Sequence, residues 1–154
     1  MKKILMIGPG RDVRGGISTV VNSYYELGIE KDAEIKYIPT MEDGGQIKKL
    51  LVAVKAYMEF CRCVKKYDIV HVHMAAQASF VRKSLFVQKA KKAGVKVIIH
   101  SHAADFDKYF FEESDDKDRK KIKETFALAD KVIVLSEEWA DFFGQTVCDP
   151  AKIK

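Results

Sequence analysis

Apolar positions along the chain follow two alternating periods. Short β-branched runs, such as 69–72, 95–99 and 132–135, are typical of strands buried on both faces of a parallel sheet. Between them lie longer segments whose apolar residues recur at helical spacing. The pattern predicts strands at 3–7, 34–38, 69–73, 95–100 and 131–135, and helices at 16–27, 46–66, 77–93, 117–129 and 136–145.

Five consecutive βα units define the fold class. Strands that alternate with helices pair in parallel through right-handed crossovers. We therefore expect an α/β fold, a doubly wound Rossmann-like parallel sheet in three α/β/α layers with the strand order 3-2-1-4-5. Gly94 has the place of a helix C-terminal cap and Ser136 that of an N-terminal cap. The mixed-charge stretch 112–123 is interpreted as a solvated loop leading into a helix.

Gly15 and Gly16 lie in a turn between the first predicted strand and the first predicted helix. Unpaired N–H groups and the helix dipole make a helix N-terminus attractive to anions, and glycine leaves that backbone open. The dinucleotide fingerprint would need a third glycine where Val13 stands, and no P-loop Gly-Lys-Ser/Thr follows. The turn predicts a site for a phosphate or sugar, with a tight turn without ligand as the alternative.

Two further loops are expected beside this turn. Ligands of open parallel sheets bind beyond the carboxyl ends of the strands, near the switch in strand order. The loops at that edge are the 8–16 turn, the stretch around His73 and the stretch around His102. We expect all three to face one cleft.

The four histidines form two H-x-H pairs, each at the end of a predicted strand. Alternate strand residues share a face, so each pair projects together. No Cys or suitable carboxylate completes a metal site, and we expect no metal. We expect His71 and His100 to be half-buried and satisfied by backbone or hydroxyl groups. His73 and His102 are expected at the mouth of the cleft, where Asp105 either orients a histidine and binds hydroxyls or begins a helix.

Size and composition limit the remaining possibilities. A chain of 154 residues with 47% hydrophobic content is expected to form one globular domain. The N-terminus is too short in apolar residues for a signal peptide, and no run approaches the roughly 20 residues that span a bilayer. The three cysteines show no metal-binding spacing, which indicates free thiols in a reducing cytoplasm.

The net charge of +5 is unevenly distributed. Residues 46–100 contain twelve Lys or Arg and two acids, which gives +10, whereas residues 101–154 contain nine basic and thirteen acidic residues, which gives −4. Such a dipolar domain presents one face to an anionic partner, for which nucleic acid, a membrane and a phosphorylated substrate are candidates. The aromatic residues lie among core positions rather than between basic residues, so we expect no nucleic-acid partner.

The predicted helix 46–66 is amphipathic. We expect its apolar arc to face the core and its cationic stripe to lie on the outer side. That stripe is either an ordinary solvated surface or a docking face for an anionic membrane leaflet. The arc consists of Ile47, Leu50, Leu51, Val54, Met58 and Cys61, and the stripe of Lys48, Lys55, Arg62 and Lys66.

Four blocks of the chain, in this order and spacing, resemble the N-terminal half of a family 4 glycosyltransferase of GT-B fold. The resemblance covers essentially the whole chain, and the four blocks together are more specific than any one of them. They are Gly15–Val21 (GGISTVV), Tyr67–His73 (YDIVHVH), Gly94–His102 (GVKVIIHSH) and Ala129–Ser136 (ADKVIVLS).

The resemblance implies a function and roles for individual residues. In that family the double glycine, here Gly15 and Gly16, lies close to the donor's diphosphate, and the histidine matching His102 contacts the transferring sugar. His100 is the alternative for that role, because the H-S-H wording departs from the commoner single histidine. The family retains anomeric configuration and is metal-independent, so no cofactor is expected. The implied reaction transfers a hexose from a nucleotide sugar to a cell-surface polysaccharide or lipid-linked acceptor, with His73 and Asp105 lining the cleft.

The resemblance also implies the domain organisation. Residues 1–154 correspond to a single N-terminal, acceptor-side domain, and the nucleotide-binding C-terminal domain is expected after Lys154. We expect the chain to be inactive without that domain, and to be cytoplasmic, peripheral on the inner face of the plasma membrane. The alternative is a non-catalytic Rossmann-like module that binds a phosphorylated ligand or a protein partner.

Overall fold

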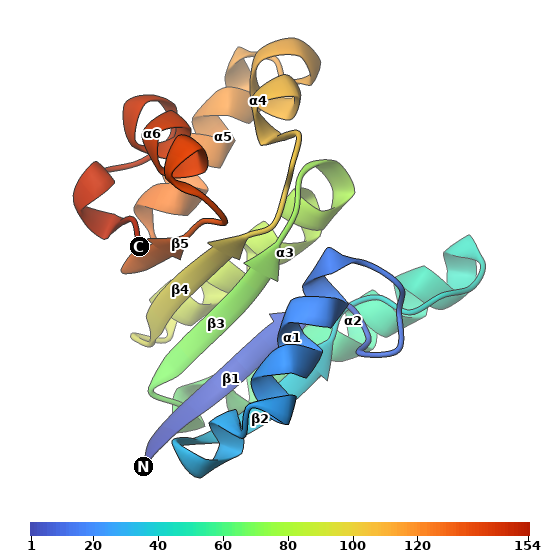
Figure 1. Ribbon diagram of the computed structural model, residues 1–154. Coiled ribbons are helices and arrows are strands. Elements are labelled where there is room, and N and C mark those ends of the chain that lie inside the picture. Colours follow the sequence, from blue (N-terminus) through green and yellow to red (C-terminus); the bar gives the residue numbers. More distant parts are fainter.

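Five parallel strands form a single sheet in the computed structural model, which describes residues 1–154 (Figure 1). Helices cover both faces of the sheet, so the predicted doubly wound α/β class is confirmed. Each predicted strand is present. They are β1 (Lys2–Gly8), β2 (Ala33–Pro39), β3 (Ile69–Met74), β4 (Lys96–Ser101) and β5 (Lys131–Ile133).

Each predicted helix is also present, with ends within three residues of those expected. In Figure 1, α1 lies over one face of the sheet, and α2 and α3 lie over the other. Short 3-10 turns at Ile29–Lys31, Val64–Lys66 and Pro150–Lys152 complete the chain. The helices are α1 (Gly16–Glu26), α2 (Gln46–Cys63), α3 (Gln77–Lys92), α4 (Phe106–Lys108), α5 (Asp116–Ala127) and α6 (Glu137–Thr146).

The strand order is β2-β1-β3-β4-β5, and the predicted position of the third strand is therefore wrong. β3 lies between β1 and β4, and five of its six residues are buried. β2 lies at the edge and carries Glu34 and Lys36 in its middle. A strand without charges suits the centre of a parallel sheet and a charged strand suits its edge, which accounts for this order.

The core fills the space between the sheet and the helices α2, α3 and α5. It is rich in phenylalanine, and Phe60, Phe86 and Phe126 are each fully buried or nearly so. Edge-to-face contacts, such as that between Phe60 and Phe86 with ring centroids 5.0 Å apart, add to the stabilisation from burial. This packing holds the carboxyl edge of the sheet in one rigid frame.

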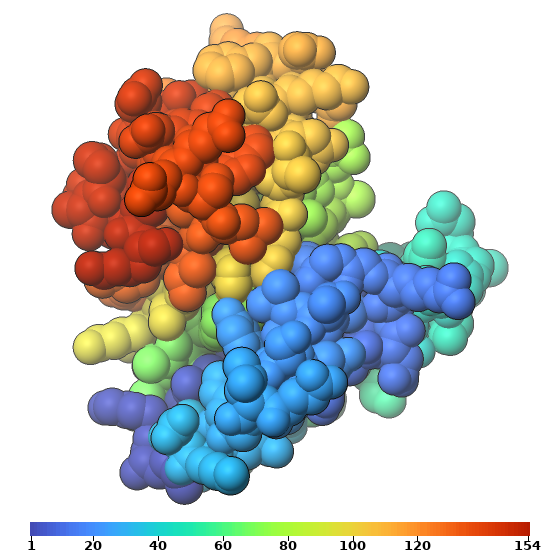
Figure 2. Space-filling model, viewed as in Figure 1, coloured from blue at the N-terminus to red at the C-terminus, as the bar shows by residue number.

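The apolar arc of α2 does not face the core, contrary to expectation. Its buried residues are Ala56 and Phe60, which lie on the opposite side of the helix. The N-terminal half of α2, in turquoise, projects away from the sheet and stands clear of the surface around it (Figures 1 and 2). A stripe of five apolar side chains is left exposed by between 47% and 78%; we call Ile47, Leu50, Leu51, Val54 and Met58 the apolar stripe of α2.

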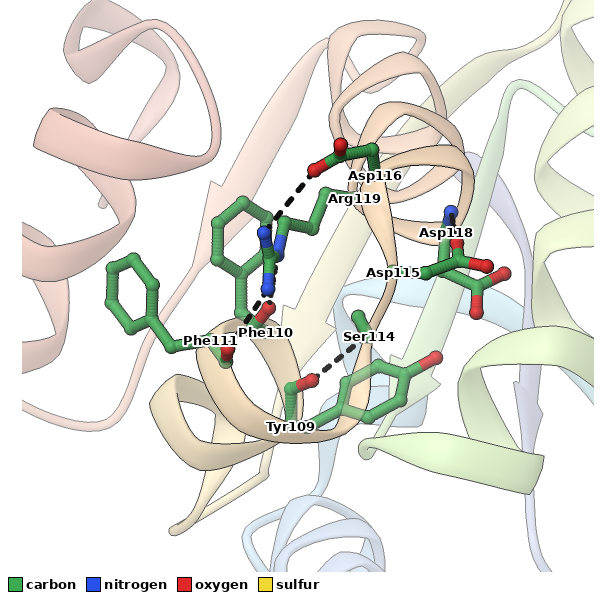
Figure 3. Close-up of polar contacts among 8 residues, drawn as sticks. All are labelled: Tyr109, Phe110, Phe111, Ser114, Asp115, Asp116, Asp118 and Arg119. Atoms are coloured by element: carbon green, nitrogen blue, oxygen red, sulfur yellow. Dashed lines mark hydrogen bonds and ion pairs between the residues drawn. The ribbon is translucent and has the colours of Figure 1, made fainter.

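The stretch 112–123, expected as a solvated loop leading into the helix predicted from residue 117, contains more helix than expected. A π-helical turn spans Tyr109–Glu113, and α5 begins at Asp116. Arg119 donates from Nε to the carbonyl of Phe110 at 2.8 Å and from a terminal nitrogen to that of Phe111 at 2.9 Å (Figure 3). The Asp115 carboxylate accepts a hydrogen bond from a backbone N–H in the first turn of α5. These bonds satisfy backbone groups that would otherwise need water.

The predicted helix caps are confirmed. Gly94 follows α3 with φ of 76°, a left-handed conformation that favours glycine. The Ser136 hydroxyl accepts a hydrogen bond from the Trp139 N–H at the start of α6. All three cysteines are unbridged. The helices are each too short or too polar to serve as a membrane span.

Candidate functional site at the carboxyl edge of the sheet

The loop between β1 and α1 presents an uncapped helix N-terminus. Gly15 is the N-cap residue with φ of 155°, no side chain caps α1, and its first turn contains no acid. A Cβ at Gly15 or Gly16 would meet no atom within 4 Å. The Ser18 hydroxyl donates to the Gly10 carbonyl at 3.1 Å, and the Gly10 N–H donates to the Met41 carbonyl at 2.7 Å. The loop is thus fixed while its N–H groups remain available to an anion.

This N-terminus faces a cavity of about 290 Å3. Gly15, Gly16, Ala75 and His102 line it, so the three predicted loops meet in one concavity although His73 itself does not line it. Strands β1 and β3 are neighbours although β2 separates them in sequence, and ligands of open α/β sheets bind at such a switch in strand order. The place of the cavity therefore follows from the topology.

Cations dominate the charged lining of the cavity. Arg14, Arg82 and Lys83 contribute to it, and no acidic residue does. Lys83 is 2% exposed, and its ammonium donates to the Ser79 hydroxyl at 3.0 Å. Burial and the neighbouring charge of Arg82 lower the pKa of Lys83 to about 7. The buried Nε of Arg82 has no hydrogen-bond partner. Lys83 is therefore about half protonated at pH 7, and no acidic side chain in the cavity neutralises it or Arg82.

His73 does not lie at the mouth of the cleft, which corrects the prediction. It is fully buried, because β3 is a central strand covered on both faces. Its Nδ1 lies 2.9 Å from Nε2 of His102, so one ring donates to the other. His102 is only half-buried and reaches the cavity. His73 thus contacts a cavity residue and fixes the orientation of its ring.

The four histidines form one stacked layer on the side of the sheet that α1 covers. Ring centroids are 4.3 Å apart for His71 and His73 and 4.0 Å apart for His100 and His102. Burial lowers the pKa of His71 to about 3 and that of His100 to about 4, with His100 adding to the effect on His71. Burial and the nearby His100 lower the pKa of His102 to about 3. The layer is therefore neutral at pH 7.

His71 and His100 are more buried than expected. The exposed fraction is 8% for His71 and 4% for His100. Nδ1 of His100 lies 3.5 Å from the hydroxyl of Tyr24, which agrees with the expected hydroxyl partner. Nε2 of His71 has no hydrogen-bond partner, so the expectation of a satisfied His71 is wrong at that atom.

Three of these histidines lie close enough to share a cation. The nearest ring nitrogens of His71, His73 and His100 lie within 4.8 Å of one another. Histidines that bind a metal usually donate their other nitrogen to a carboxylate or carbonyl. Nε2 of His71 and of His73 has no hydrogen-bond partner, as a nitrogen free to bind an ion would have none. Nδ1 of His73 faces His102 and Nδ1 of His100 faces the Tyr24 hydroxyl, so neither ring is oriented by the carboxylate or carbonyl that is usual at a metal centre.

The other predicted site residues lie away from the cavity. Asp105 is exposed, begins the short helix α4 without capping it, and does not line the cavity with Gly15. The four cations of the predicted stripe are exposed along α2 and the turn after it, as expected. Lys48 pairs with Glu42 at 3.4 Å, whereas the others form no ion pair; they are Lys55, Arg62 and Lys66.

Sequence reasoning missed Ser79, Arg82 and Lys83. One signal was present in the chain. Lys83 falls between Phe80 and Val87 at helical spacing, on the side of α3 that the apolar residues bury. A lysine at such a position is either strained or functional, because lysine is rarely buried without a partner. That reading would have placed a cation at the edge of the cavity.

Comparison with known families gives one result. The model of the family described as Glycosyltransferase Family 4 matches residues 24–154. The match includes β3, β4 and the histidine layer between them. No curated protein matches the chain.

Proposed function

Since the chain belongs to glycosyltransferase family 4, we propose that it is the acceptor-side domain of a retaining hexosyltransferase that uses a nucleotide-sugar donor. The acceptor is a cell-surface polysaccharide or a lipid-linked glycan. One observation carries this proposal: the open N-terminus of α1 faces a cavity lined by three cations and no acid. A diphosphate is the anionic part of such a donor, and this lining complements its charge.

In the proposed reaction, Gly15 and Gly16 hold the leaving diphosphate. Negative charge grows on that group as the bond to the sugar breaks, and fixed N–H dipoles and cations stabilise it. The open space above Gly16 lets the phosphate approach the backbone. Arg14, which lies in the same loop as the two glycines, adds positive charge to the lining of the cavity.

His102 orients the transferring sugar in this proposal. Its ring is neutral at pH 7, so it acts through hydrogen bonds and does not supply a proton as an imidazolium. The hydrogen bond with His73 fixes which ring nitrogen can face the cavity. His102 is the proposed catalytic residue, and His73 is a positioning residue.

A second domain and the absence of a metal complete the proposal. The cavity is open at the carboxyl edge of the sheet, and we assign the grip on the nucleotide to a C-terminal domain of the same enzyme. Residues 1–154 alone are then inactive. Phosphate charge is neutralised by backbone N–H groups and cations rather than by a metal ion, in keeping with the cationic lining.

The apolar stripe of α2 supports attachment to an anionic membrane, the inner face of the plasma membrane in a cytoplasmic enzyme. Five adjacent apolar side chains stand exposed, and Lys48, Lys55 and Arg62 flank them. Glu59, the one acid within α2, pairs instead with Lys36 of β2 at 2.7 Å. An amphipathic helix of this kind buries its apolar side among lipid tails while its cations contact lipid phosphates. Such attachment brings the cavity to a membrane-bound acceptor.

The Gly16→Val variant of the full-length enzyme tests the donor site. The branched side chain meets no protein atom but occupies the space above the N-terminus of α1. We expect the donor KM to rise at least about tenfold, or turnover to stop, with thermal stability nearly unchanged. The assay is repeated in excess chelator, where the wild type should keep its rate.

Gly45→Val is the matched control. Gly45 is the N-cap of α2, a Cβ there also meets no atom within 4 Å, and it does not line the cavity. Its kinetics should match those of the wild type. Unchanged donor kinetics in Gly16→Val would mean that the loop is only a turn.

A further inference from the structure

A second hollow adjoins the cationic cavity. It is a groove of about 780 Å3 between α2 and α3. Met41 and Arg82 line both the groove and the cavity, so the two spaces meet at these side chains. The groove thus runs from the exposed face of α2 to the site proposed for transfer.

The lining of the groove is mostly apolar, and its two charged residues are both basic. Leu50 of α2 and Val81 and Leu85 of α3 line it, and each is exposed by 48% to 64%. The charged residues in its lining are Lys49 and Arg82, and it has no acid. Leu50 also belongs to the apolar stripe of α2, so the groove opens directly onto the face proposed to contact lipid.

The cavity that the groove joins at Arg82 holds basic side chains that lack an anion. Lys83 is buried, and its one hydrogen bond goes to the neutral hydroxyl of Ser79. The Nε of Arg82 is buried without a partner. A buried charge is costly unless a counter-charge and hydrogen bonds compensate it. A phosphate at this place would supply both.

We infer that the groove and the α3 cations form a binding site for a lipid phosphate, whose chain lies between α2 and α3 and whose phosphate contacts Arg82, Lys83 and Ser79. This names the acceptor class and rests on the proposed transferase function. The occupant comes from the bilayer, because the apolar end of the groove opens at the membrane-facing stripe. Charge complementarity fixes the orientation of the lipid in the groove, with its phosphate toward the cavity and its hydrocarbon chain toward α2.

Octyl phosphate is the simplest probe that carries both parts of this ligand. Its binding to the 154-residue chain is measured by calorimetry below its micelle concentration, beside inorganic phosphate and octanol. We expect octyl phosphate to bind at least about tenfold more tightly than either inorganic phosphate or octanol, because each occupies only half of the site.

Two variants separate the halves of the site. Lys83→Met removes the ammonium group, shortens the side chain by one heavy atom and suits a buried position. It should weaken the binding of both phosphates at least about tenfold and leave the binding of octanol unchanged. The double variant Val81→Ser with Leu85→Ser alters exposed positions, so folding is preserved. It should weaken the binding of octyl phosphate and leave the binding of inorganic phosphate unchanged. Circular dichroism confirms that each variant is folded.

The inference is overturned if octyl phosphate binds no more tightly than inorganic phosphate, or if folded Lys83→Met binds both phosphates as the wild type does. These experiments contain no donor, so they are independent of the transferase assay. If the enzyme transfers sugar but the chain does not bind octyl phosphate, the lipid-phosphate acceptor is ruled out and the proposed function stands. If the chain binds octyl phosphate but the enzyme has no transferase activity, the lipid-phosphate site stands and its role as an acceptor site is ruled out.

Discussion

Single residues of this chain derive their chemistry from burial. Lys83, His71 and His102 would be charged or readily charged in water, and each has a lowered pKa because the fold removes it from solvent. The lysine remains available as a cation near neutrality, whereas the histidines are held neutral. The cavity therefore combines a positive lining with one uncharged hydrogen-bonding ring, that of His102, which suits an anionic leaving group beside a polar sugar.

The buried histidines predict acid lability of the fold. Their folded pKa values lie below the ordinary value of 6.5, about 3 for His71 and about 4 for His100. As the pH falls below about 6.5, the unfolded chain binds protons that the folded chain does not, so the unfolding free energy decreases. Each histidine contributes up to about 1.4 kcal/mol per pH unit until the pH reaches its folded pKa. Chemical denaturation between pH 7 and pH 4.5 measures this slope.

His100→Gln isolates one contribution. Gln keeps a polar group near Tyr24 but does not titrate, so the stability of the variant should fall less steeply with acidification than that of the wild type. The unfolding free energies of His100→Gln and the wild type at pH 7 differ only through packing, and that difference does not depend on pH. Parallel curves over the whole range would show that His100 is not held neutral by the fold.

At the scale of the residue, the sequence predicted the positions of Gly15, Gly16 and His102 but not the roles of their neighbours. The glycine turn and the H-x-H pairs are local patterns, and because the strands are parallel, the loops that follow them lie at one edge of the sheet. The complete burial of His73 depends on which strand is central, and the cavity position of Lys83 depends on how α3 lies against the β1–α1 loop. Neither can be read from local spacing.

Among the elements, α2 departs most from expectation. Its apolar periodicity predicted a helix of the right length, and the helix is present. The wider apolar arc was assigned to the core, whereas the helix buries the narrower face of Ala56 and Phe60. Periodicity identifies two faces but does not say which one meets the sheet when both contain apolar residues. The outward stripe is therefore a property that only the tertiary structure reveals.

The exposed stripe of α2 predicts binding to vesicles that contain anionic lipid. Ile47→Ser, Leu51→Ser and Met58→Ser together remove apolar insertion without touching the groove lining. A second variant changes Lys48, Lys55, Arg62 and Lys66 to Gln. We expect each variant to weaken co-sedimentation at least about tenfold, since each cation contributes about 1 kcal/mol near an anionic surface. Salt should weaken wild-type binding and have little effect on the charge variant.

Matched controls lie elsewhere on the surface. Leu27→Ser removes an exposed leucine beyond α1, and Gln at Lys108, Lys117, Lys120 and Lys123 removes four exposed charges from the α4–α5 region. Both controls should bind as the wild type does. If the control variants lose as much binding as the α2 variants, the attraction is a property of net charge and not of α2.

For the whole molecule, the topology explains where the site lies. In the order β2-β1-β3-β4-β5, β2 is added on one side of β1 and the later strands are added on the other side. The strand order therefore switches between β1 and β3, and the loops that follow β1, β3 and β4 meet beyond that point. The fold class and the meeting of these loops were predictable, because βα alternation admits few arrangements. The strand order was not fixed by alternation, although the charges of β2 indicate an edge strand. A wrong strand order still gave the right edge of the sheet, since all parallel strands end there.

The N-terminus of α1 as an anion site is the central claim for the molecule, and amide chemical shifts test it most directly. Inorganic pyrophosphate is titrated into the isotope-labelled 154-residue chain, to about 10 mM because one domain alone binds weakly. We predict saturable shifts of the Gly15 and Gly16 amides, with the Gly45 amide at the equally open N-terminus of α2 unchanged. Equal shifts at both helix N-termini, or none at Gly15 and Gly16, would contradict the account.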